Sequence, residues 1–390
     1  MNFALTDEQN QIVETARKVG ARFGLSYWRD HDERKAFPTE FWQAVCDAGL
    51  SGVALTEEYG GAGLGMLEMA LIVEQLAAGG GGGALIMLFV TNAIFGGLSL
   101  SRFGSEIMKK QILPKIASGE IRCCMALTEP DAGTNSLEIK TFAERSNDGW
   151  RLNGQKIWIT AVEAAKKMLV VARTTKLEKA AKRTHGISMF MIDVDRPGLS
   201  FTPIDKLGTN ALSSCIVFFD NVRIDAGELI GTLDHGWFEL VDVLNTERIV
   251  VTAGLAGIAA LATRLAIEYA KERRIFGGRP IAAYQGIQFP LAQHWAEVEC
   301  ARLMNYKAAV LCDRGEPYIT EANIAKLLAS QAASAAVERS MQTMGGMGYS
   351  KEMHVERLWR DARLARIAPI SEEMILNFIA NQNLGMPRSY

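Results

Sequence analysis

Histidine and cysteine, the residues that most often bind metals, are few and widely spaced in this sequence. The histidines show no HxxxH or HExxH spacing, which disfavours a metal hydrolase and leaves scattered packing or surface histidines as the expectation. They are His31, His185, His235, His294 and His354. None of the six cysteines forms a CxxC pair. Because a chain of 390 residues can bury a core without disulfides, we expect reduced thiols and no metal site.

Glycine clusters are the second feature that could indicate ligand chemistry. The five glycines at residues 79–83 follow a helical pattern and have no lysine beside them. A phosphate-binding loop instead joins a strand to a helix and usually contains a lysine. We therefore interpret this run as a flexible break in a helix. No GxGxxG motif follows a predicted strand, so a nicotinamide-dinucleotide fold is also disfavoured.

Composition and charge limit the class of protein further. Hydrophobic residues make up 48% and charged residues 22% of the chain, as in ordinary globular proteins. The net charge of −2 argues against a nucleic-acid partner and against an acidic disordered tail. No uninterrupted apolar stretch reaches the roughly 18–20 residues of a membrane span, and no secretory signal is visible. We expect a cytoplasmic protein with two or three domains.

Hydrophobic periodicity divides the chain into three parts that would position any site. Residues 1–122 are expected to form an N-terminal helical domain, which opens with a capping box at Thr6-Asp7-Glu8-Gln9 and continues with helices at 40–48, 66–78 and 106–117. Residues 123–230 contain short runs rich in Val, Ile and Phe at 168–172, 187–194 and 215–219. Asn153-Gly154 is predicted to form the turn of a hairpin over residues 149–160.

Residues 231–390 return to helical spacing. Long helices are predicted over 248–274, 290–313 and 320–344, with a final one near 372–382. Together they indicate a four-helix bundle. The expected fold class is α+β, with an N-terminal helical domain, a middle antiparallel β domain (123–230) and a C-terminal helical bundle domain (231–390).

Five motifs in a fixed order point to a family, although each alone is weak. Residues 125–135 read Met-Ala-Leu-Thr-Glu-Pro-Asp-Ala-Gly-Thr-Asn, and residues 158–160 read Trp-Ile-Thr. The end of the first long C-terminal helix carries Arg273, Phe276, Gly277 and Gln285. Further on, Gln342, Gly345, Gly346 and Gly348 precede Glu356-Arg357-Leu358-Trp359-Arg360-Asp361. In this order and spacing the chain resembles the acyl-CoA dehydrogenase family of flavoproteins over essentially its whole length.

The resemblance implies an FAD cofactor held without a glycine fingerprint. Thr128 and its neighbour Leu127 would contact the pyrimidine side of the flavin, Trp158 would lie along the ring, and Thr160 would lie near its N5 atom. Gly133 belongs to the same cofactor-binding stretch. Thr134 stands where the family usually has a serine that touches the nucleotide tail of the substrate.

A second group of cofactor-binding residues is implied at the far end of the bundle. Arg273, Phe276, Gln285, Gln342, Gly345 and Gly346 would hold the diphosphate and adenosine of an FAD bound by a neighbouring subunit. Oligomerisation would then be part of cofactor binding. By family analogy we expect a homotetramer built as a dimer of dimers.

The family reaction requires a base, because the α-proton of an acyl-CoA thioester is weakly acidic. Most of the family places a glutamate in the loop after the Arg-Asp motif, but the matching position here is Pro369. A minority, including the isovaleryl-CoA and long-chain enzymes, places it in a Glu-Arg motif that matches Glu247-Arg248. We therefore predict Glu247 as the catalytic base and Arg248 as a substrate-binding residue. On its own, such a glutamate would be read as a solvated residue at a helix start. Glu372 and Glu373 are weaker candidates.

The same loop raises a question about the reaction. In the family, the backbone N–H at the position of Pro369 helps to bind the thioester oxygen, and proline has no N–H. Losing one such donor typically lowers a rate by about 10²–10³-fold. Another N–H, such as that of Ile370, could serve, or the flavin ribityl hydroxyl could act alone. Pro369 and Ile370 are expected to line the substrate site, where Ile370 would reshape the pocket.

Three functional hypotheses follow from the resemblance. The first is FAD-dependent α,β-dehydrogenation of an acyl-CoA, with electrons passed to an electron-transferring flavoprotein. The second is altered chemistry on the same scaffold, as an enoyl-CoA reductase, an oxidase or a lyase, which the Pro369 loop suggests. The third is a non-catalytic FAD-binding subunit, against which Trp158, Glu247 and Arg248 argue.

Overall fold

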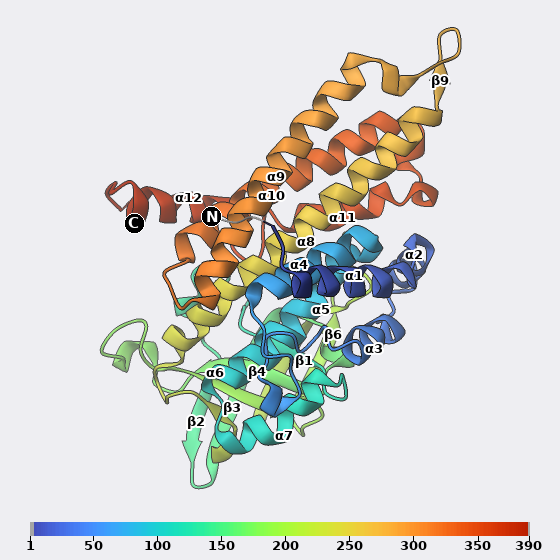
Figure 1. Cartoon of the computed structure of the whole chain (residues 1–390). Helices are drawn as coiled ribbons and strands as arrows, with labels where there is room; N and C mark the ends of the chain where they lie inside the picture. The colour runs from blue at the N-terminus through green and yellow to red at the C-terminus, as the bar shows by residue number, and fades with distance from the viewer. Residues whose placement is uncertain (1–3, 389–390) are drawn as a thin grey trace.

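A computed structural model of the chain describes residues 4–388, and its elements form a helical part, a sheet and a helical bundle (Figure 1). At the start of the first helix, the Thr6 hydroxyl accepts from the Gln9 N–H and the Gln9 amide oxygen accepts from the Thr6 N–H. The predicted capping box is therefore confirmed. The helices of this part are α1 (Asp7–Ala21), α2 (Leu25–Arg34), α3 (Thr39–Asp47), α4 (Met66–Leu76), α5 (Gly82–Phe89), α6 (Ser99–Phe103) and α7 (Glu106–Ala117).

The glycine run lies between α4 and α5 and forms a buried kink. It overlaps a π-helical turn, η2 (Ala77–Gly81), and a second π-helical stretch, η3 (Val90–Leu98), joins α5 to α6. Gly80 has φ 133° and Gly82 has φ 58°, conformations that side-chain-bearing residues rarely adopt. A Cβ atom on Gly82 would also lie 2.5 Å from Nη1 of Arg357. The run therefore breaks the helix, as predicted, but the break is a buried kink that lets Arg357 approach the backbone closely.

The middle part is a mixed sheet with strand order β6-β7-β3-β2-β4-β5-β8, with β1 beside β4. Most neighbours are antiparallel, as predicted, but β1 and β2 both run parallel to β4. The strands are β1 (Cys123–Ala126), β2 (Phe142–Ser146), β3 (Gly149–Thr160), β4 (Lys167–Arg173), β5 (Ile187–Asp193), β6 (Leu199–Pro203), β7 (Ser214–Asp225) and β8 (Leu229–Ile230). The sequence did not reveal β1, β2, β6 or β8.

The predicted hairpin turn at Asn153-Gly154 is wrong, because β3 runs through it without interruption. The chain reverses instead between Ser146 and Gly149, where β2 pairs with β3. Gly154 has φ 147° and lies where the register between β3 and β7 shifts, as at a β-bulge. An Asn-Gly pair suits a bulge as well as a tight turn, because both use backbone conformations that glycine adopts easily.

The C-terminal part is a helical bundle in which three long helices predominate (Figure 1). Its helices are α8 (Gly236–Glu272), α9 (Gln285–Asp313), α10 (Ile319–Met344), α11 (Val355–Leu364) and α12 (Glu372–Phe378), and the short strands β9 (Arg274–Ile275) and β10 (Arg279–Pro280) pair between α8 and α9. The helix predicted at 248–274 begins at Gly236, so Glu247 lies inside it. The sequence did not predict α11, which packs on α10 and α8.

Within residues 4–388, two helical stretches are long and apolar enough to cross a membrane by length and composition, although no such span was expected from the sequence. They span Met66–Phe103 and Gly236–Glu272, and their most apolar windows are 94% and 83% buried inside the protein. Glycines bring them together, because a Cβ on Gly257 of α8 would lie 2.4 Å from the carbonyl oxygen of Glu74 on α4. Packing within the core accounts for their apolar character.

A buried ion pair on α11 ties the three parts together. Arg357 donates to the carbonyl oxygen of Gly80, 2.7 Å away, and lies 3.5 Å from the carboxylate of Asp361. That carboxylate accepts from the N–H of Gly83 at 2.9 Å and from the N–H of Thr209, in the loop before β7, at 2.7 Å. The bundle is therefore joined to both other parts by one pair of charged side chains.

Candidate active site

Glu247 lies in α8 and is only 4% exposed. Its Oε2 atom has no hydrogen-bond partner among residues 4–388. Burial raises the pKa of Glu247 to about 8, although the positive charges of Arg248 and Lys326 act in the opposite direction. A buried carboxyl group without a partner destabilises a fold and is rare in structural positions. This position therefore has the character of a functional acid or base rather than of the solvated glutamate that its sequence alone would indicate.

Arg248 is partly buried beside this carboxyl group but does not bond to it. Its Nη1 donates to the Oδ1 atom of Asn245 at 2.7 Å, one turn earlier on α8. Burial lowers the pKa of the Arg248 guanidinium, and the charge of Glu247 opposes that shift. Asn245 thus holds the guanidinium while the carboxyl group of Glu247 stays available.

The loop between α11 and α12 contains both predicted substrate residues, Pro369 and Ile370, and the Ala368–Pro369 peptide bond is cis. Lys326 of α10 donates from Nζ to the carbonyl oxygens of Ala365 and Ile370, each 2.6 Å away. Within the part of the chain that is described, the N–H of Ile370 donates to no protein acceptor. Lys326 thus connects the loop to the surroundings of Glu247.

The two weaker base candidates have other environments. The Glu372 carboxylate is buried and accepts from Arg366 at 2.7 Å and 3.0 Å, from Ser330 at 3.3 Å and from Gln331 at 3.4 Å. The hydrogen bond from Arg366 is the main reason that the Glu372 pKa is lowered. Glu373 is exposed on α12. Glu372 therefore has a structural role, and of the three candidate bases Glu247 is the one with a buried carboxylate oxygen that finds no partner among the described residues.

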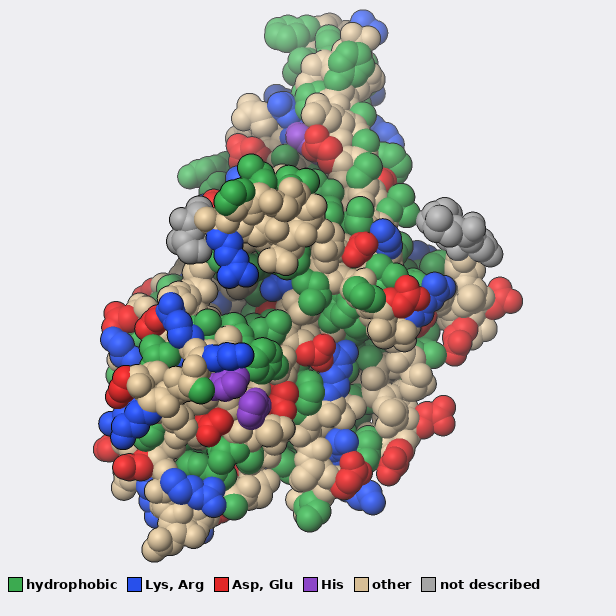
Figure 2. Space-filling view, turned by 90° about the vertical axis from the view of Figure 1, so that its left-hand side faces the viewer, with side chains coloured by type: hydrophobic (Ala, Val, Ile, Leu, Met, Phe, Trp, Pro, Cys, Tyr) green, Lys and Arg blue, Asp and Glu red, His purple; other side chains and the backbone are tan. Residues whose placement is uncertain are grey.

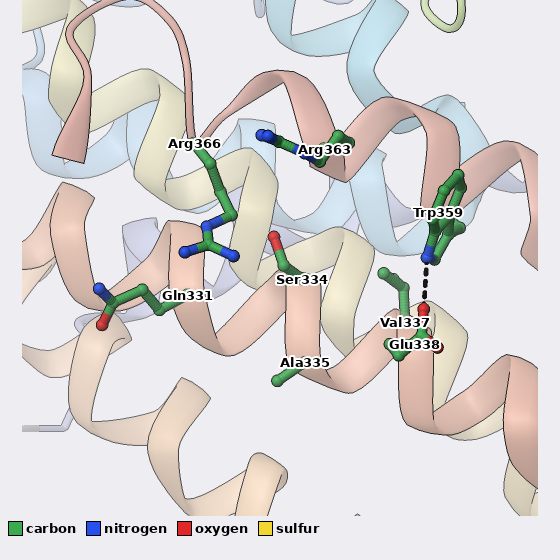
Figure 3. A pocket seen from close by; sticks show the side chains of 8 residues that line it. All are labelled: Gln331, Ser334, Ala335, Val337, Glu338, Trp359, Arg363 and Arg366. Carbon is green, nitrogen blue, oxygen red and sulfur yellow. Dashed lines mark hydrogen bonds between the residues drawn. The ribbon is translucent and has the colours of Figure 1, made fainter.

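A cavity of about 350 Å³ lies between α10 and α11 (Figure 3). It is lined by Gln331, Ser334, Ala335, Val337, Glu338, Trp359, Arg363 and Arg366. Trp359 donates from its indole nitrogen to Glu338 at 2.6 Å across one side of it. None of the site residues predicted from the sequence lines this cavity, although two of its lining residues, Gln331 and Arg366, bind Glu372.

The predicted flavin-side residues of the middle domain are brought together by hydrogen bonds between β3 and the segment after β1. The Ile157 N–H donates to the carbonyl oxygen of Thr128 at 2.9 Å. The buried Lys156 ammonium donates to the carbonyl oxygen of Leu127 and to Glu129, both at 2.8 Å. These bonds fix Leu127 and Thr128 beside the residues that end β3.

Trp158 and Thr160 complete this group at the end of β3. Trp158 has φ 63° and an indole that is 54% exposed, and Thr160 is partly buried. Gly133 and Thr134 lie exposed on the loop that follows Thr128, where a Cβ on Gly133 would meet no atom within 4 Å. An exposed indole next to a backbone segment fixed by a buried ion pair can contact a flat aromatic ligand.

The second group of predicted cofactor residues lies at the far end of the bundle. A small apolar cluster there joins the end of α8, the start of α9 and the end of α10 through Ala266, Leu291 and Met344. Around it, six residues are exposed: Arg273, Phe276, Gln285, Gln342, Gly345 and Gly346. Phe276 is 88% exposed, and Figure 2 shows hydrophobic side chains at the protruding tip of the molecule.

The two predicted groups cannot serve one FAD within a single chain. At 1.5 Å per residue, the stretch of α8 from Glu247 to its C-cap residue, Arg273, is roughly 39 Å long. Figure 1 likewise shows β9 at the opposite end of the molecule from β2 and β3. Within one chain, the tip therefore lies far from Glu247 and from the sheet.

Comparisons with known proteins identify the family. Three family models match: the acyl-CoA dehydrogenase N-terminal domain over residues 6–120, the middle domain over 124–222 and the C-terminal domain over 234–384. Acyl-CoA dehydrogenase FadE12 of Mycobacterium tuberculosis (strain ATCC 25618 / H37Rv) is 40% identical over 100% of this chain and 99% of its own length.

Solved structures agree with these matches. A glutaryl-coenzyme A dehydrogenase in complex with glutaryl-CoA superposes with a TM-score of 0.94 at 31% identity, covering 100% of this chain and 98% of the other. A chain from a structure of the electron-transferring flavoprotein of Acidaminococcus fermentans gives 0.92 at 31% identity, covering 98% of this chain and 100% of the other. The three-part architecture is thus the acyl-CoA dehydrogenase fold. The chain belongs to the acyl-CoA dehydrogenase family, whose members are FAD-dependent oxidoreductases.

The residues present fit an FAD. Trp158 offers an exposed ring face beside the ordered backbone of Thr128. At the tip of the bundle, Gly345 has φ 59°, and a Cβ on Gly345 or Gly346 would meet no atom within 4 Å. This leaves open backbone at the same end of the bundle as the exposed Arg273, whose guanidinium pairs well with a diphosphate.

Sequence reasoning missed two buried lysines that organise the site. Lys156 fixes the backbone at Leu127, and Lys326 holds the loop of Pro369. Lys326 was detectable in principle, because it recurs at helical spacing with Ala322, Ala329 and Ala333, all on the buried face of α10. A lysine at such a position is rare and usually paired.

Proposed function

We infer that this enzyme removes the α-proton of a saturated acyl-CoA with Glu247 and transfers the β-hydrogen as a hydride to FAD. The observation that supports this most directly is the buried Oε2 of Glu247, which lacks a protein partner. The loop position that most of the family uses for its base holds Pro369, which cannot accept a proton. Glu372 is occupied by Arg366, so Glu247 is the carboxyl group free for the task.

Burial tunes Glu247 toward proton transfer. With a pKa raised to about 8, Glu247 is a stronger base than an ordinary carboxylate when it is ionised. The positive charges of Arg248 and Lys326 oppose the effect of burial and keep the ionised form accessible near neutral pH. Activity that depends on ionised Glu247 should therefore increase with pH up to about 8.

The thioester oxygen needs a hydrogen-bond donor while negative charge develops on it. Pro369 has no N–H. The N–H of Ile370 is free of protein acceptors in the described chain, and the carbonyl oxygen of the same residue is held by Lys326. We therefore assign the Ile370 N–H as the donor that replaces the one lost at Pro369.

FAD, when bound, supplies the hydride acceptor for this reaction. Leu127, Thr128, Trp158 and Thr160 would hold its ring, with Gly133 and Thr134 toward the nucleotide tail of the substrate. The exposed residues at the bundle tip would serve the FAD of a neighbouring subunit, which explains their distance from Glu247. A homotetramer follows from family analogy and from the exposed apolar side chains at that tip.

We propose an electron-transferring flavoprotein as the electron acceptor. Family analogy supports it, as does the close superposition on a chain from a structure of such a flavoprotein. Altered chemistry on this scaffold is the second candidate, and the observation behind it is the missing N–H at Pro369. An enoyl-CoA reductase, one form of that second candidate, would differ from the dehydrogenase in which acyl-CoA reacts with the bound flavin.

The test is an anaerobic titration of the FAD-loaded enzyme with saturated acyl-CoAs, from butyryl-CoA to palmitoyl-CoA together with isovaleryl-CoA. We expect one class of substrate to bleach the visible flavin absorption in the parent and in Glu373→Gln, a control at the neighbouring exposed glutamate. In Glu247→Gln, bleaching should slow by at least about 10³-fold. If no saturated acyl-CoA bleaches the parent while an enoyl-CoA oxidises its chemically reduced form, the altered-chemistry candidate replaces this one.

A further inference from the structure

Lys326 is a buried cation that has no assigned role in the proposed proton and hydride transfer. Its side chain lies on α10 and is 0% exposed. Nζ donates to the carbonyl oxygens of Ala365 and Ile370, at 2.6 Å each, and these two residues bracket the loop that carries Pro369. The loop is therefore attached to α10 at both ends by one ammonium group.

The other polar ties of the loop are mostly local, because the N–H groups of Ile367 and Ala368 both donate to the carbonyl oxygen of Leu364 at the end of α11, 2.9 Å away. Arg366 contacts Glu372 from a side chain that is 46% exposed, so that ion pair is partly screened by water. Pro369 has no N–H to donate, and the N–H of Ile370 donates to no protein acceptor among residues 4–388. The two bonds from Lys326 are the buried side-chain contacts that tie the backbone of the loop to α10, while Pro369 itself is exposed.

Lys326 also belongs to the charged surroundings of the proposed base. Four charged groups influence its pKa: Glu247 and Arg248 of α8, and Glu372 and Glu373 of α12. Burial lowers the pKa of Lys326 to about 8, while the three carboxylates act to raise it and Arg248 acts to lower it further. In turn, Lys326 and Arg248 are the two cations that favour the ionised form of Glu247.

We propose that Lys326 is a positioning residue with two tasks: it fixes the Pro369 loop so that the Ile370 N–H can meet the thioester oxygen, and its charge favours ionised Glu247. Lys326 on α10 thus supports the Pro369 loop, which lacks both the glutamate and the N–H donor that most of the family has there. This inference rests on the proposed function of Glu247. The first of its two measurements does not depend on that function.

Three substitutions separate the two tasks. Lys326→Met removes the charge and the hydrogen bonds, Lys326→Gln keeps N–H donors without the charge, and Lys326→Arg keeps the charge. Lys206→Met is the matched control, because the partly buried Lys206 also donates to two backbone carbonyls, those of Thr209 and Leu212, but in the middle domain. All are compared as full-length enzyme loaded with FAD.

The first measurement is amide hydrogen exchange of residues 365–371, which needs no substrate. We expect Lys326→Met to exchange on the order of tenfold faster there, and Lys326→Gln to stay closer to the parent. Lys206→Met should leave this segment unchanged. Equal exchange in Lys326→Met and the parent would overturn the loop-fixing task, whatever the enzyme catalyses. If Lys326→Met does not fold, Lys326→Gln takes its place: exchange faster than in the parent and in Lys326→Arg supports the task, because a shorter neutral side chain holds the two carbonyl oxygens less tightly than the ammonium, and parent-like exchange in both variants overturns it.

The second measurement is the pH dependence of flavin bleaching by the most reactive acyl-CoA of the panel. The midpoint of the rise should move up by about one pH unit in Lys326→Met and Lys326→Gln and stay in place in Lys326→Arg and Lys206→Met. An unmoved midpoint in Lys326→Gln, together with an inactive Glu247→Gln, would refute the electrostatic task and leave the proposed function intact. A fully active Glu247→Gln would refute the proposed function itself, and with it the electrostatic task.

Discussion

The ion pair of Arg357 and Asp361 gives the sharpest test of how the three parts are held together. In Asp361→Asn the amide has one oxygen for two backbone donors, the N–H groups of Gly83 and Thr209, which bind different carboxylate oxygens in the parent. The amide nitrogen must then face one of these N–H groups. Arg357 also loses its closest counter-charge in a site where it is 3% exposed.

The structure sets the size of this effect. Breaking a buried ion pair by removing one partner costs about 3–5 kcal/mol. An unfolding entropy of about 2.1 cal/mol/K per residue gives about 0.8 kcal/mol/K for 390 residues that unfold together. The melting temperature of Asp361→Asn should therefore fall by about 4–6 °C, as measured by differential scanning calorimetry on the FAD-loaded enzyme.

A matched exposed pair provides the control. Lys35 and Asp205 form an ion pair at 2.5 Å on the surface, and Asp205→Asn should leave the melting temperature unchanged because water already screens that pair. If Asp361→Asn melts within about 1 °C of the parent, the buried pair does not join the three parts in the way described.

Three further predictions concern other features of the molecule. Glu247→Gln should stabilise the protein more at pH 8 than at pH 5, as measured by urea unfolding. The folded pKa of Glu247 is raised from 4.5 to about 8, so the parent loses free energy of unfolding as the pH rises through that range, whereas the neutral amide does not. An equal effect at both pH values would contradict the burial of Glu247. Gly82→Ala should cost about 2 kcal/mol, because its φ is +58° and its Cβ would crowd Arg357, whereas Gly286→Ala, with no atom within 4 Å, should be tolerated; equal stabilities would count against the close approach. Phe276→Asp should dissociate the oligomer and weaken FAD retention in size-exclusion chromatography, whereas Ile107→Asp, at a 69% exposed position on α7, should do neither; an intact FAD-loaded oligomer for Phe276→Asp would refute the shared site.

The sequence predicted a helix accurately where local signals marked both its start and its end. α7 runs over Glu106–Ala117 as expected, because Ser105 caps its first turn and Gly119 follows its end. Asn153-Gly154 was misread because a bulge and a turn make the same demand on glycine, and only pairing with β7 distinguishes them. α11 went unpredicted because it is short and carries four charged residues before Arg363; its burial depends on the pairing of Arg357 and Asp361.

The candidate site was likewise only partly predictable from the sequence. The position of Glu247 followed from its motif, but its burial did not, because α8 begins twelve residues before its predicted start. The consequence of Pro369 was visible in the sequence as a missing N–H. The compensation was not, because Lys326 is 43 residues away along the chain and meets the loop only through the packing of α10. Long-range polar contacts of this kind leave no local pattern.

The central claim is that Glu247 removes the α-proton, and solvent exchange tests it most directly. The FAD-loaded enzyme is incubated anaerobically in D₂O with the acyl-CoA that bleaches its flavin, and deuterium at the α-carbon is followed by NMR. Parent and Glu373→Gln should incorporate deuterium, and Glu247→Gln should do so no faster than the acyl-CoA without enzyme. Incorporation by Glu247→Gln at the parent rate would show that another group is the base.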